Sequence, residues 1–471
     1  MKKLPILFFA LAFLGIGISK GQYIVLHNFG TIPSDGASPY GSLTISGKVL
    51  YGMTRYGGAH NHGCVFSIDT TGENYKLLLS FDSINGSEPW GKPTLSGKLL
   101  YGMTSGGGAY NDGCIFSIDT NGNNYRDLLD FNGTNGAAPF GSLTLFGYKF
   151  YGMTSEGGLY NYGCVFSIDS SGSNYKDLLD FNGYKGSYPF GSLTFSGKVL
   201  YGMTSEEGIY GNVFSIDTDG SEFKNLYNFS NLNPDNGMWP RCSLALSNNK
   251  LYGMTIQGGI EGNIFSLDTN GNGCKDMFNF DGARETGASP YGSLTLYGNL
   301  LYGMTFAGAV NGGGNIFSID TDGSGYQDMF DFINPIGAEP WGDLTLSGNM
   351  LYGMTNVGGI DSVGVIFKIN INSRGTAGVN NVTATSASIN IYPNPSNGKF
   401  NVICHSEQSE ESLPQIKVYN VLGEQVLTET LRSAQGYNAI DLSSQPNGIY
   451  LYRVISETGN LLGEGKLVIQ K

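Results

Sequence analysis

The stretch Tyr51-Gly52-Met53-Thr54 recurs letter for letter along the chain and decides its fold. Six more copies follow at intervals of 50 residues, or 51 in one case, and begin at Tyr101, Tyr151, Tyr201, Tyr252, Tyr302 and Tyr352. A fixed period of this length is typical of repeat architectures, in which each unit is one supersecondary element. The apolar, aromatic-rich run around each copy, such as Lys98–Thr104, predicts a β-strand. The sequence therefore predicts an all-β protein built from seven similar units.

Each full unit is predicted to hold four strands, a to d. In the units around residues 101 and 151, strand a is of the type 141–145, strand b carries the Tyr-Gly-Met-Thr stretch, strand c is of the type 114–119 and strand d of the type 125–131. The seventh unit ends after strand c, at 365–370, whereas the segment 23–29 matches a strand d. A strand from the N-terminus would complete the last unit and remove the exposed sheet edges. This count predicts a seven-bladed β-propeller with ring closure by the N-terminal strand.

Composition narrows the class of protein. The chain of 471 residues holds 72 glycines, 29 tyrosines and 27 phenylalanines, and its formal net charge is −13. Glycine and aromatic residues at regular spacing suit short strands joined by tight turns. A nucleic-acid partner is not expected, because it would require a basic surface.

The cysteines are expected to be free thiols. Cys64, Cys114 and Cys164 occupy the same site in three successive units, and equivalent sites on neighbouring blades should lie roughly 15 Å apart, given the spacing of strands. A disulfide requires Cα atoms within about 7 Å of each other. Cys242 and Cys274 fall on the first and last strands of one unit, and Cys404 lies in another domain.

The repeat unit resembles a known family. The pattern Leu-Tyr-Gly-Met-Thr-Ser-x-Gly-Gly…Gly-x-Val/Ile-Phe-Ser-Ile-Asp, seen at 100–119, is similar to the GloVer tandem repeat. The resemblance covers residues 23 to about 372 and implies a kelch-like propeller. It implies no established activity.

The two ends of the chain indicate export. Residues 1–21 form a predicted signal peptide, with a basic start, an apolar run and small residues before Gln22. After the propeller, predicted at 22–372, a linker at 373–388 precedes a C-terminal domain at 389–471 whose periodicity predicts a small antiparallel β-sandwich. That domain resembles the type A sorting domain of the type IX secretion system, by its Tyr-Pro-Asn-Pro opening at 392–395 and its Gly-Ile-Tyr strand. The resemblance implies a Bacteroidota-type bacterium, a type IX secretion partner and an extracellular or outer-membrane surface location. No transmembrane helix is expected in the mature chain.

Metal and cofactor sites are not predicted. The Asp-x-Asp/Asn-Gly turns between strands c and d offer two or three oxygens each, whereas calcium takes six to eight, so we interpret them as structural Asx turns. His60 and His62 share one b–c loop but have no carboxylate or cysteine nearby in ligand spacing.

Catalysis would need positions where the repeat symmetry breaks. Lys92, Asp343, Glu88, Glu339 and Arg241 are the charged departures near the starts of the inner strands. A glycosidase or lyase could use such groups as acid and base. The spacing of these residues does not identify a pair of carboxylates that could act together. A glycosidase or lyase activity therefore stays an alternative to binding.

Aromatic side chains in the long loops give the candidate binding site. The residue after each repeated proline is interpreted as a wedge packed between blades, at Tyr40, Trp90, Phe140, Phe190, Tyr291 and Trp341. The b–c loops carry rings among Asn and Gly, an adaptable surface of the kind used in recognition. The candidate ligand-binding residues are Tyr56, His60, His62, Tyr110, Tyr160, Tyr162 and Tyr210.

These features favour an exported binding or adhesion module for an extracellular glycan, polysaccharide or protein. The alternatives are a polysaccharide-active enzyme on the long-loop face and a structural component of the cell surface. Near-perfect repetition favours binding or structure, because catalysis usually draws unlike residues from different blades.

Overall fold

The structure is a computed structural model and describes residues 23–206, 210–230, 237–371, 388–392, 396–405, 415–420, 425–430, 437–455 and 461–471. It divides into two compact units, residues 1–375 and 376–471. The expected signal peptide lies outside the described residues, as does all but the end of the expected linker. Nowhere in the described residues does a helix have the length and apolar character needed to cross a bilayer.

The first unit is made of four-stranded antiparallel sheets, of which the described residues form seven. Sheet 1 contains β3 (Thr44–Ser46), β4 (Val49–Thr54), β6 (Cys64–Asp69) and β7 (Lys76–Ser80). Sheet 2 contains β8 (Thr94–Ser96), β9 (Leu99–Thr104), β10 (Cys114–Asp119) and β11 (Arg126–Asp130). Sheet 3 contains β12 (Thr144–Phe146), β13 (Lys149–Thr154), β14 (Cys164–Asp169) and β15 (Lys176–Asp180).

Sheets 4 to 6 repeat the same order of strands. Sheet 4 contains β16 (Thr194–Ser196), β17 (Val199–Thr204), β18 (Asn212–Asp217) and β19 (Lys224–Asn228). Sheet 5 contains β20 (Ala245–Ser247), β21 (Lys250–Thr255), β22 (Asn263–Asp268) and β23 (Lys275–Asn279). Sheet 6 contains β24 (Thr295–Tyr297), β25 (Leu300–Met304), β26 (Asn315–Asp320) and β27 (Gln327–Asp331).

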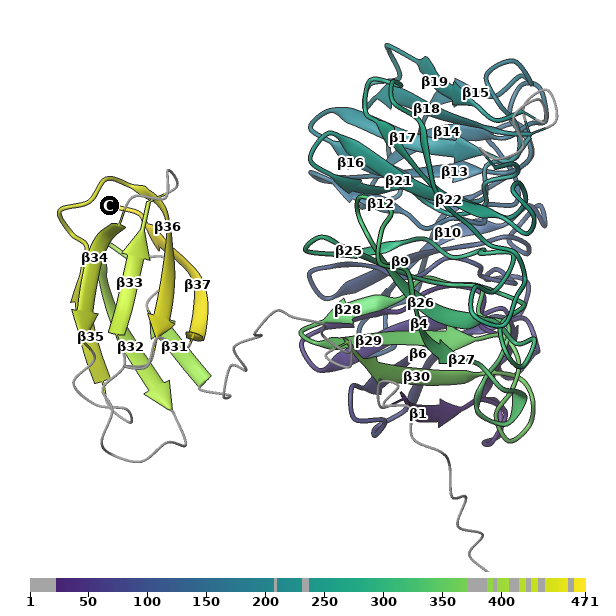
Figure 1. Ribbon diagram of the computed structural model, residues 1–471. Coiled ribbons are helices and arrows are strands. Elements are labelled where there is room, and N and C mark those ends of the chain that lie inside the picture. Colours follow the sequence, from purple (N-terminus) through teal and green to yellow (C-terminus); the bar gives the residue numbers. More distant parts are fainter. Residues whose placement is uncertain are drawn as a thin grey trace, which may run out of the picture. The chain divides into compact units, whose positions relative to one another are not determined.

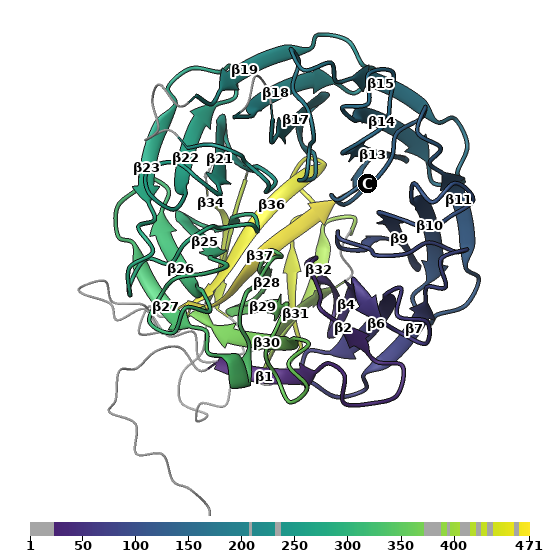
Figure 2. The ribbon, with the colours of Figure 1, turned by 90° about the vertical axis from the view of Figure 1, so that its right-hand side faces the viewer.

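Sheet 7 combines the two ends of this unit. Its strands are β28 (Thr345–Ser347), β29 (Met350–Thr355), β30 (Val365–Asn370) and β1 (Tyr23–Asn28). The N-terminal strand β1 pairs antiparallel with β30, with Tyr23 opposite Ile369. Figures 1 and 2 show the sheets arranged around a common axis, with β7, β11, β15, β19, β23, β27 and β1 at the perimeter. The short pair β2 (Gly36–Ala37) and β5 (Tyr56–Gly57) and the 3-10 turn η2 (Asn334–Ile336) lie in the loops.

The Tyr-Gly-Met-Thr stretch is explained by packing within and between sheets. Met103 is buried, and Gly102 has no side chain because the ring of Phe116 covers it: a Cβ there would lie 2.5 Å from Cζ of that ring. Thr104 is fully buried and its hydroxyl donates to the backbone oxygen of Gly106, 3.0 Å away. The glycine, the methionine and the threonine of the repeated stretch therefore each have a separate packing or hydrogen-bonding role.

The run at the start of each inner strand, which is Gly-Ser-Leu-Thr in most repeats, joins neighbouring sheets. The Ser142 N–H donates to Ser192 Oγ at 2.7 Å, and the Thr144 hydroxyl donates to the Leu193 oxygen at 2.6 Å. The same bonds connect sheet 7 to sheet 1, since the Asp343 N–H donates to Ser42 Oγ at 2.7 Å and Thr345 Oγ1 to the Leu43 oxygen at 2.6 Å. Backbones approach so closely here that a Cβ on Gly141 would lie 2.3 Å from the Gly191 oxygen.

The inner strands differ in detail from the sequence expectation. The expected strand 141–145 is observed as β12, Thr144–Phe146, because residues 141–143 make contacts between sheets instead of ladder pairs. The turn between β3 and β4 has two residues, because Ser46 pairs with Val49 and Gly47 and Lys48 lie between them. Gly47 has φ of +59°, a conformation that glycine adopts without steric cost.

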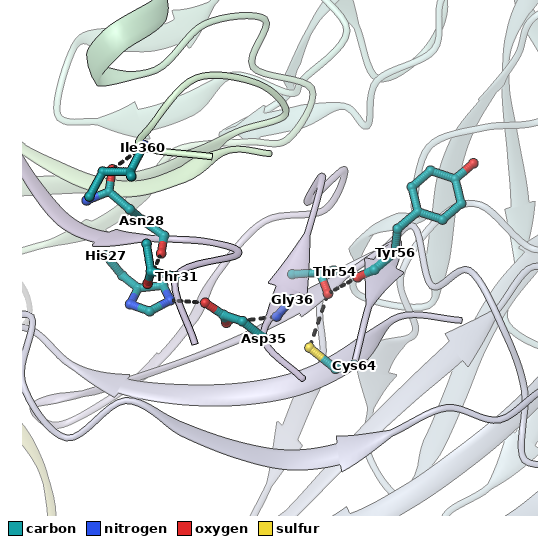
Figure 3. Close-up of polar contacts among 9 residues, drawn as sticks. All are labelled: His27, Asn28, Thr31, Asp35, Gly36, Thr54, Tyr56, Cys64 and Ile360. Carbon is teal, nitrogen blue, oxygen red and sulfur yellow. Dashed lines mark hydrogen bonds and ion pairs between the residues drawn. The ribbon is translucent and has the colours of Figure 1, made fainter. Parts of the chain in front are cut away.

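The N-terminal strand is also fixed by a buried polar contact (Figure 3). Nε2 of His27 in β1 lies 3.0 Å from Oδ2 of Asp35, whose side chain is 0% exposed, while the His27 side chain is 12% exposed. The other carboxylate oxygen of Asp35 accepts a hydrogen bond from the Gly36 N–H at 2.8 Å. The His27 ring stacks on Tyr75, with centroids 3.9 Å apart. Burying an anion is costly unless it is paired, so this contact ties β1 to the loop that follows it.

The second unit consists of two antiparallel sheets. One contains β31 (Ser388–Tyr392), β32 (Lys399–His405) and β35 (Tyr437–Asp441), and the other contains β33 (Gln415–Tyr419), β34 (Gln425–Thr430), β36 (Gly448–Ile455) and β37 (Leu461–Ile469). Buried residues from both sheets form one core, with Phe400 and Val402 from the first and Ile416, Val454 and Leu467 from the second. This arrangement agrees with the sandwich expected from the periodicity.

The described cysteine side chains are free thiols. Cys64, Cys114, Cys164 and Cys242 are buried and Cys274 is partly buried. Burial raises the pKa of the first four to about 12, so these thiols stay protonated at neutral pH. The side chain of Cys404 lies outside the described residues.

Candidate functional site

The residue after each repeated proline faces the axis around which the sheets are arranged. We call these seven residues the collar: six are aromatic and the one from sheet 5 is arginine. They line a cavity of about 80 Å³ and are Tyr40, Trp90, Phe140, Phe190, Arg241, Tyr291 and Trp341. The interpretation of the aromatic residues as wedges between blades is therefore incomplete, because their rings also line a cavity.

The collar is continuous from sheet to sheet. Neighbouring ring centroids are 4.6 Å apart for Tyr40 and Trp90, 4.7 Å for Trp90 and Phe140, and 4.9 Å for Phe140 and Phe190. The guanidinium of Arg241 lies over Phe190 at 4.6 Å and over Tyr291 at 5.8 Å. Trp341 then stacks on Tyr291 at 4.0 Å and contacts Tyr40 at 4.7 Å. Arginine thus takes the place of an aromatic ring by a cation–π contact.

Strained backbone holds each collar residue in place. The residue before each repeated proline has positive φ, between 48° and 57°, although it is not glycine in any of the seven copies: Ser38, Glu88, Ala138, Tyr188, Trp239, Ser289 and Glu339. Such conformations are costly and persist only where the surroundings enforce them. The backbone N–H of Glu88 donates to the backbone oxygen of His62 at 2.9 Å. The backbone oxygen of Glu88 accepts from the backbone N–H of Ser105 at 3.2 Å. The proline loop is thereby held between two b–c loops.

Charged residues from several sheets lie at the collar. Lys92 and Asp343 line the small cavity, and both also line a larger axial cavity of about 720 Å³ bounded by the inner strands. Oδ1 of Asp343 accepts a hydrogen bond from the Ser293 N–H at 2.5 Å. Arg55 is bound to Glu88, with its Nη2 2.7 Å from Oε2, and its guanidinium lies 4.9 Å from the centre of the Tyr40 ring and 4.6 Å from that of Trp90. The symmetry-breaking charges proposed from the sequence thus include three that line the cavity: Lys92, Arg241 and Asp343.

The candidate binding residues of the b–c loops fall into two groups. Tyr110, Tyr160 and Tyr162 are exposed, by 61%, 51% and 38%, and His60 is also exposed. Tyr110 and Tyr160 occupy equivalent positions, each followed by an asparagine at positive φ whose side chain accepts a hydrogen bond within the loop. These loops therefore present their rings in a repeated, fixed backbone conformation.

The remaining candidates are partly buried. Tyr56 lies under the Arg55 guanidinium, 4.8 Å away, and burial raises its pKa. Tyr210 packs against the core around sheet 5, and its backbone oxygen accepts from the backbone N–H of Trp239 at 2.9 Å. His62 is also partly buried, and its backbone oxygen supports Glu88. In the described residues, no three His, Cys, Asp or Glu side chains gather closely enough to hold a metal ion.

The collar is a candidate site that the sequence pattern alone did not reveal. Its signal was present in the repeated proline followed by an aromatic residue, with arginine as the exception. Residue spacing could place these rings at the start of the inner strands. It could not show that they meet around an axis.

Solved structures that overlap this chain do so at low similarity. TolB from Acinetobacter baumannii is 18% identical over 59% of this chain and 63% of its own, with a TM-score of 0.37. A puromycin-hydrolysing peptidase from Mycobacterium tuberculosis is 11% identical over 83% and 62%, with a TM-score of 0.47. The extracellular domain of a proposed one-component system from B. thetaiotaomicron is 12% identical over 95% and 58%, with a TM-score of 0.46. The chain thus spans about three fifths of the length of these three proteins.

Sequence families give a firmer assignment. No curated protein matches the chain. The Gloeobacter/Verrucomicrobia repeat matches residues 14–212, 72–262, 209–320 and 262–411, and the secretion system C-terminal sorting domain matches residues 390–470. The sorting domain implies interaction with the type IX secretion system and export to the cell surface or beyond it. The chain belongs to the Gloeobacter/Verrucomicrobia repeat family and ends in a type IX sorting domain.

Proposed function

We propose that this protein is an exported binding module that holds an extracellular polysaccharide on its long-loop face. The observation that carries the proposal is the exposure of Tyr110 and Tyr160 at equivalent positions of neighbouring repeats. Sugars present apolar C–H faces edged with hydroxyls, which suits tyrosine rings beside asparagine amides. One such contact is weak, but equivalent loops around a ring can engage a repeating polymer several times and gain avidity.

The scaffold of this proposal is a closed, seven-bladed, kelch-like propeller. Three contacts support it: the pairing of β1 with β30, the bond from Asp343 to Ser42, and the ring contact of Trp341 with Tyr40. Removing residues 23–29 leaves β30 as an unpaired edge, so we expect a marked loss of thermal stability and a tendency to aggregate. A truncated chain that melts like the parent would contradict closure by this strand.

The proposal includes the route of export. A signal peptide at residues 1–21 would direct the chain across the inner membrane, and the sorting domain would direct it across the outer membrane of a Bacteroidota-type cell.

The binding function is tested with the double variant Tyr110→Ala/Tyr160→Ala. The full chain is screened against immobilised polysaccharides, and the variant is compared with the parent on every polymer that binds. We expect at least tenfold weaker binding and a nearly unchanged melting temperature, since both rings are exposed. Tyr148→Ala is the matched control, because Tyr148 is 84% exposed but lies in the short turn between β12 and β13, away from the long loops. Equal binding by the double variant and the parent would show that these tyrosines do not form the site.

An enzyme on the same face is the second candidate. It is favoured by Lys92 and Asp343, two opposite charges that precede the inner strands of sheets 2 and 7 and both line the axial cavity. Incubating the bound polysaccharide with the protein and following its chain length distinguishes the two functions.

A further inference from the structure

The collar holds N–H groups that have no hydrogen-bond partner. Nε1 of Trp90, Nε1 of Trp341 and Nε of Arg241 are buried from solvent and make no hydrogen bond to a described residue. Leaving a buried donor unpaired is unfavourable, and such groups are few in native structures. All three belong to side chains that line the same 80 Å³ cavity. A ligand that satisfies them must carry hydrogen-bond acceptors.

The charges that line this cavity favour an anion. Lys92 and Arg241 are cationic, and the Lys92 ammonium makes no hydrogen bond or ion pair to a described residue. Asp343 is the opposing charge, but one of its oxygens is occupied by the Ser293 N–H. Glu88, at the outer side of the collar, is paired with Arg55. The cavity therefore has one positive charge in excess, although the whole chain has a formal net charge of −13.

We propose that the collar binds the carboxylate of an acidic sugar, a uronic acid residue of the polysaccharide. The carboxylate would accept hydrogen bonds from the two indole N–H groups and from the two cations, which are the stronger donors. The collar rings would lie against the apolar face of the sugar. The inference deepens the proposed function, on which it rests for the class of polymer, and assigns a second site distinct from the exposed tyrosines.

Binding requires the collar rings to part. Each of the three unpaired N–H groups is covered by its neighbours, so an acceptor cannot reach it while all the ring contacts are kept. The collar side chains are only partly buried, and Lys92 and Asp343 line the larger axial cavity as well as the small one. Displacement of an indole from a stacked aromatic contact changes its surroundings, which gives the experiment an optical signal.

The test uses tryptophan fluorescence of the full chain. The protein has three tryptophans, and two of them are collar residues, so a Trp239→Phe background leaves only Trp90 and Trp341 to report. This protein is titrated with a glucuronate-containing oligosaccharide and, separately, with the same oligosaccharide after chemical reduction of its carboxyl groups. We expect a saturable fluorescence change with the acidic oligosaccharide, at least tenfold weaker binding of the reduced one, and loss of affinity at high salt.

Three variants replace a charged residue of the cavity with the residue that other repeats carry at the same position. Lys92→Ser and Arg241→Phe introduce the residues that other repeats carry there, so both are compatible with the fold. Each removes a cation and should weaken binding at least tenfold. Asp343→Ser removes the opposing anion in the same way and should tighten binding several-fold. Circular dichroism and thermal melting confirm that each variant is folded.

The outcomes separate this inference from the proposed function. Equal affinity for the acidic and the reduced oligosaccharides would overturn the assignment of a carboxylate. If polysaccharide is retained through Tyr110 and Tyr160 but the collar fluorescence does not respond, the collar site is wrong and the proposed function stands. If no polysaccharide is retained and no fluorescence change occurs, both are wrong. Weakening by Lys92→Ser and Arg241→Phe with tightening by Asp343→Ser would support the collar site.

Discussion

The buried pair of His27 and Asp35 offers a sharp test of how the N-terminal strand is held. Other repeats carry leucine where β1 has His27, at Leu79 and Leu129, and asparagine where the loop has Asp35, at Asn85. Both residues can therefore be replaced by residues that the fold already accepts at the same positions of other repeats. The three variants are His27→Leu, Asp35→Asn and the double variant.

The expected magnitudes follow from burial. Asp35 is 0% exposed, so His27→Leu leaves a buried carboxylate with one remaining hydrogen bond, from the Gly36 N–H. Leaving a buried carboxylate without its partner costs about 3 kcal/mol, and we expect a loss of about this size because leucine keeps an apolar contact with Tyr75 but offers no donor. Asp35→Asn removes the charge and keeps an acceptor for Gly36, at a cost of about 1 kcal/mol. The double variant should lie within about 1 kcal/mol of the parent, because neither change then leaves an unpaired charge.

Urea unfolding of all four proteins at neutral pH, followed by tyrosine and tryptophan fluorescence, gives the free energy of unfolding for a double-mutant cycle. We expect the two single changes to be non-additive by about 3 kcal/mol or more, with the double variant more stable than His27→Leu alone. The urea midpoints are compared only among variants whose free energy of unfolding depends equally steeply on urea concentration. A change in the unfolded state is then not mistaken for lost stability. If the two effects simply add, His27 and Asp35 are not coupled and this account of how β1 is held is wrong.

Three further predictions concern other parts of the molecule. Burial and the neighbouring Asp180 carboxylate raise the pKa of Asp177 to about 6; since the folded state then favours the protonated form, its stabilising contribution is present below the unfolded pKa and is lost as pH rises from about 4 to about 6. Asp177→Asn should thus increase the free energy of unfolding at pH 7 by about 1 kcal/mol, after discounting for a half-exposed group, and flatten its pH profile; an unchanged profile in urea melts across that range would contradict this. Gly102→Ala forces a Cβ against the Phe116 ring and should cost about 1–3 kcal/mol in thermal melts, with partial recovery in Gly102→Ala/Phe116→Leu, whereas a neutral single change would refute the packing account. Deletion of residues 390–471 should leave a protease-resistant repeat domain in the periplasm, and surface display of that truncation, measured by cell fractionation, would exclude the sorting role.

The sequence by itself determined the repeat, the strands and their order. The fixed period placed Cys114–Asp119 as a strand with the bounds later observed, and the likeness of residues 23–29 to the d strands identified β1 as part of the last sheet. These features are local or periodic: alternation of apolar residues, turn glycines and spacing along the chain are sufficient to specify them. The inner strands were less well predicted, because the sequence does not reveal that residues 141–143 contact the next sheet instead of pairing within their own.

Only the tertiary structure decided what the collar residues do. Spacing gave Trp90 and Trp341 the same position in their repeats but carried no information on the curvature that brings their rings within 5.9 Å of each other. It likewise set Lys92 and Asp343 about 250 residues apart, whereas the structure places both at one cavity. The physical reason is that a repeat fixes the contacts of each unit with its neighbours, while the axis where all units meet exists only after every sheet has added its own rotation.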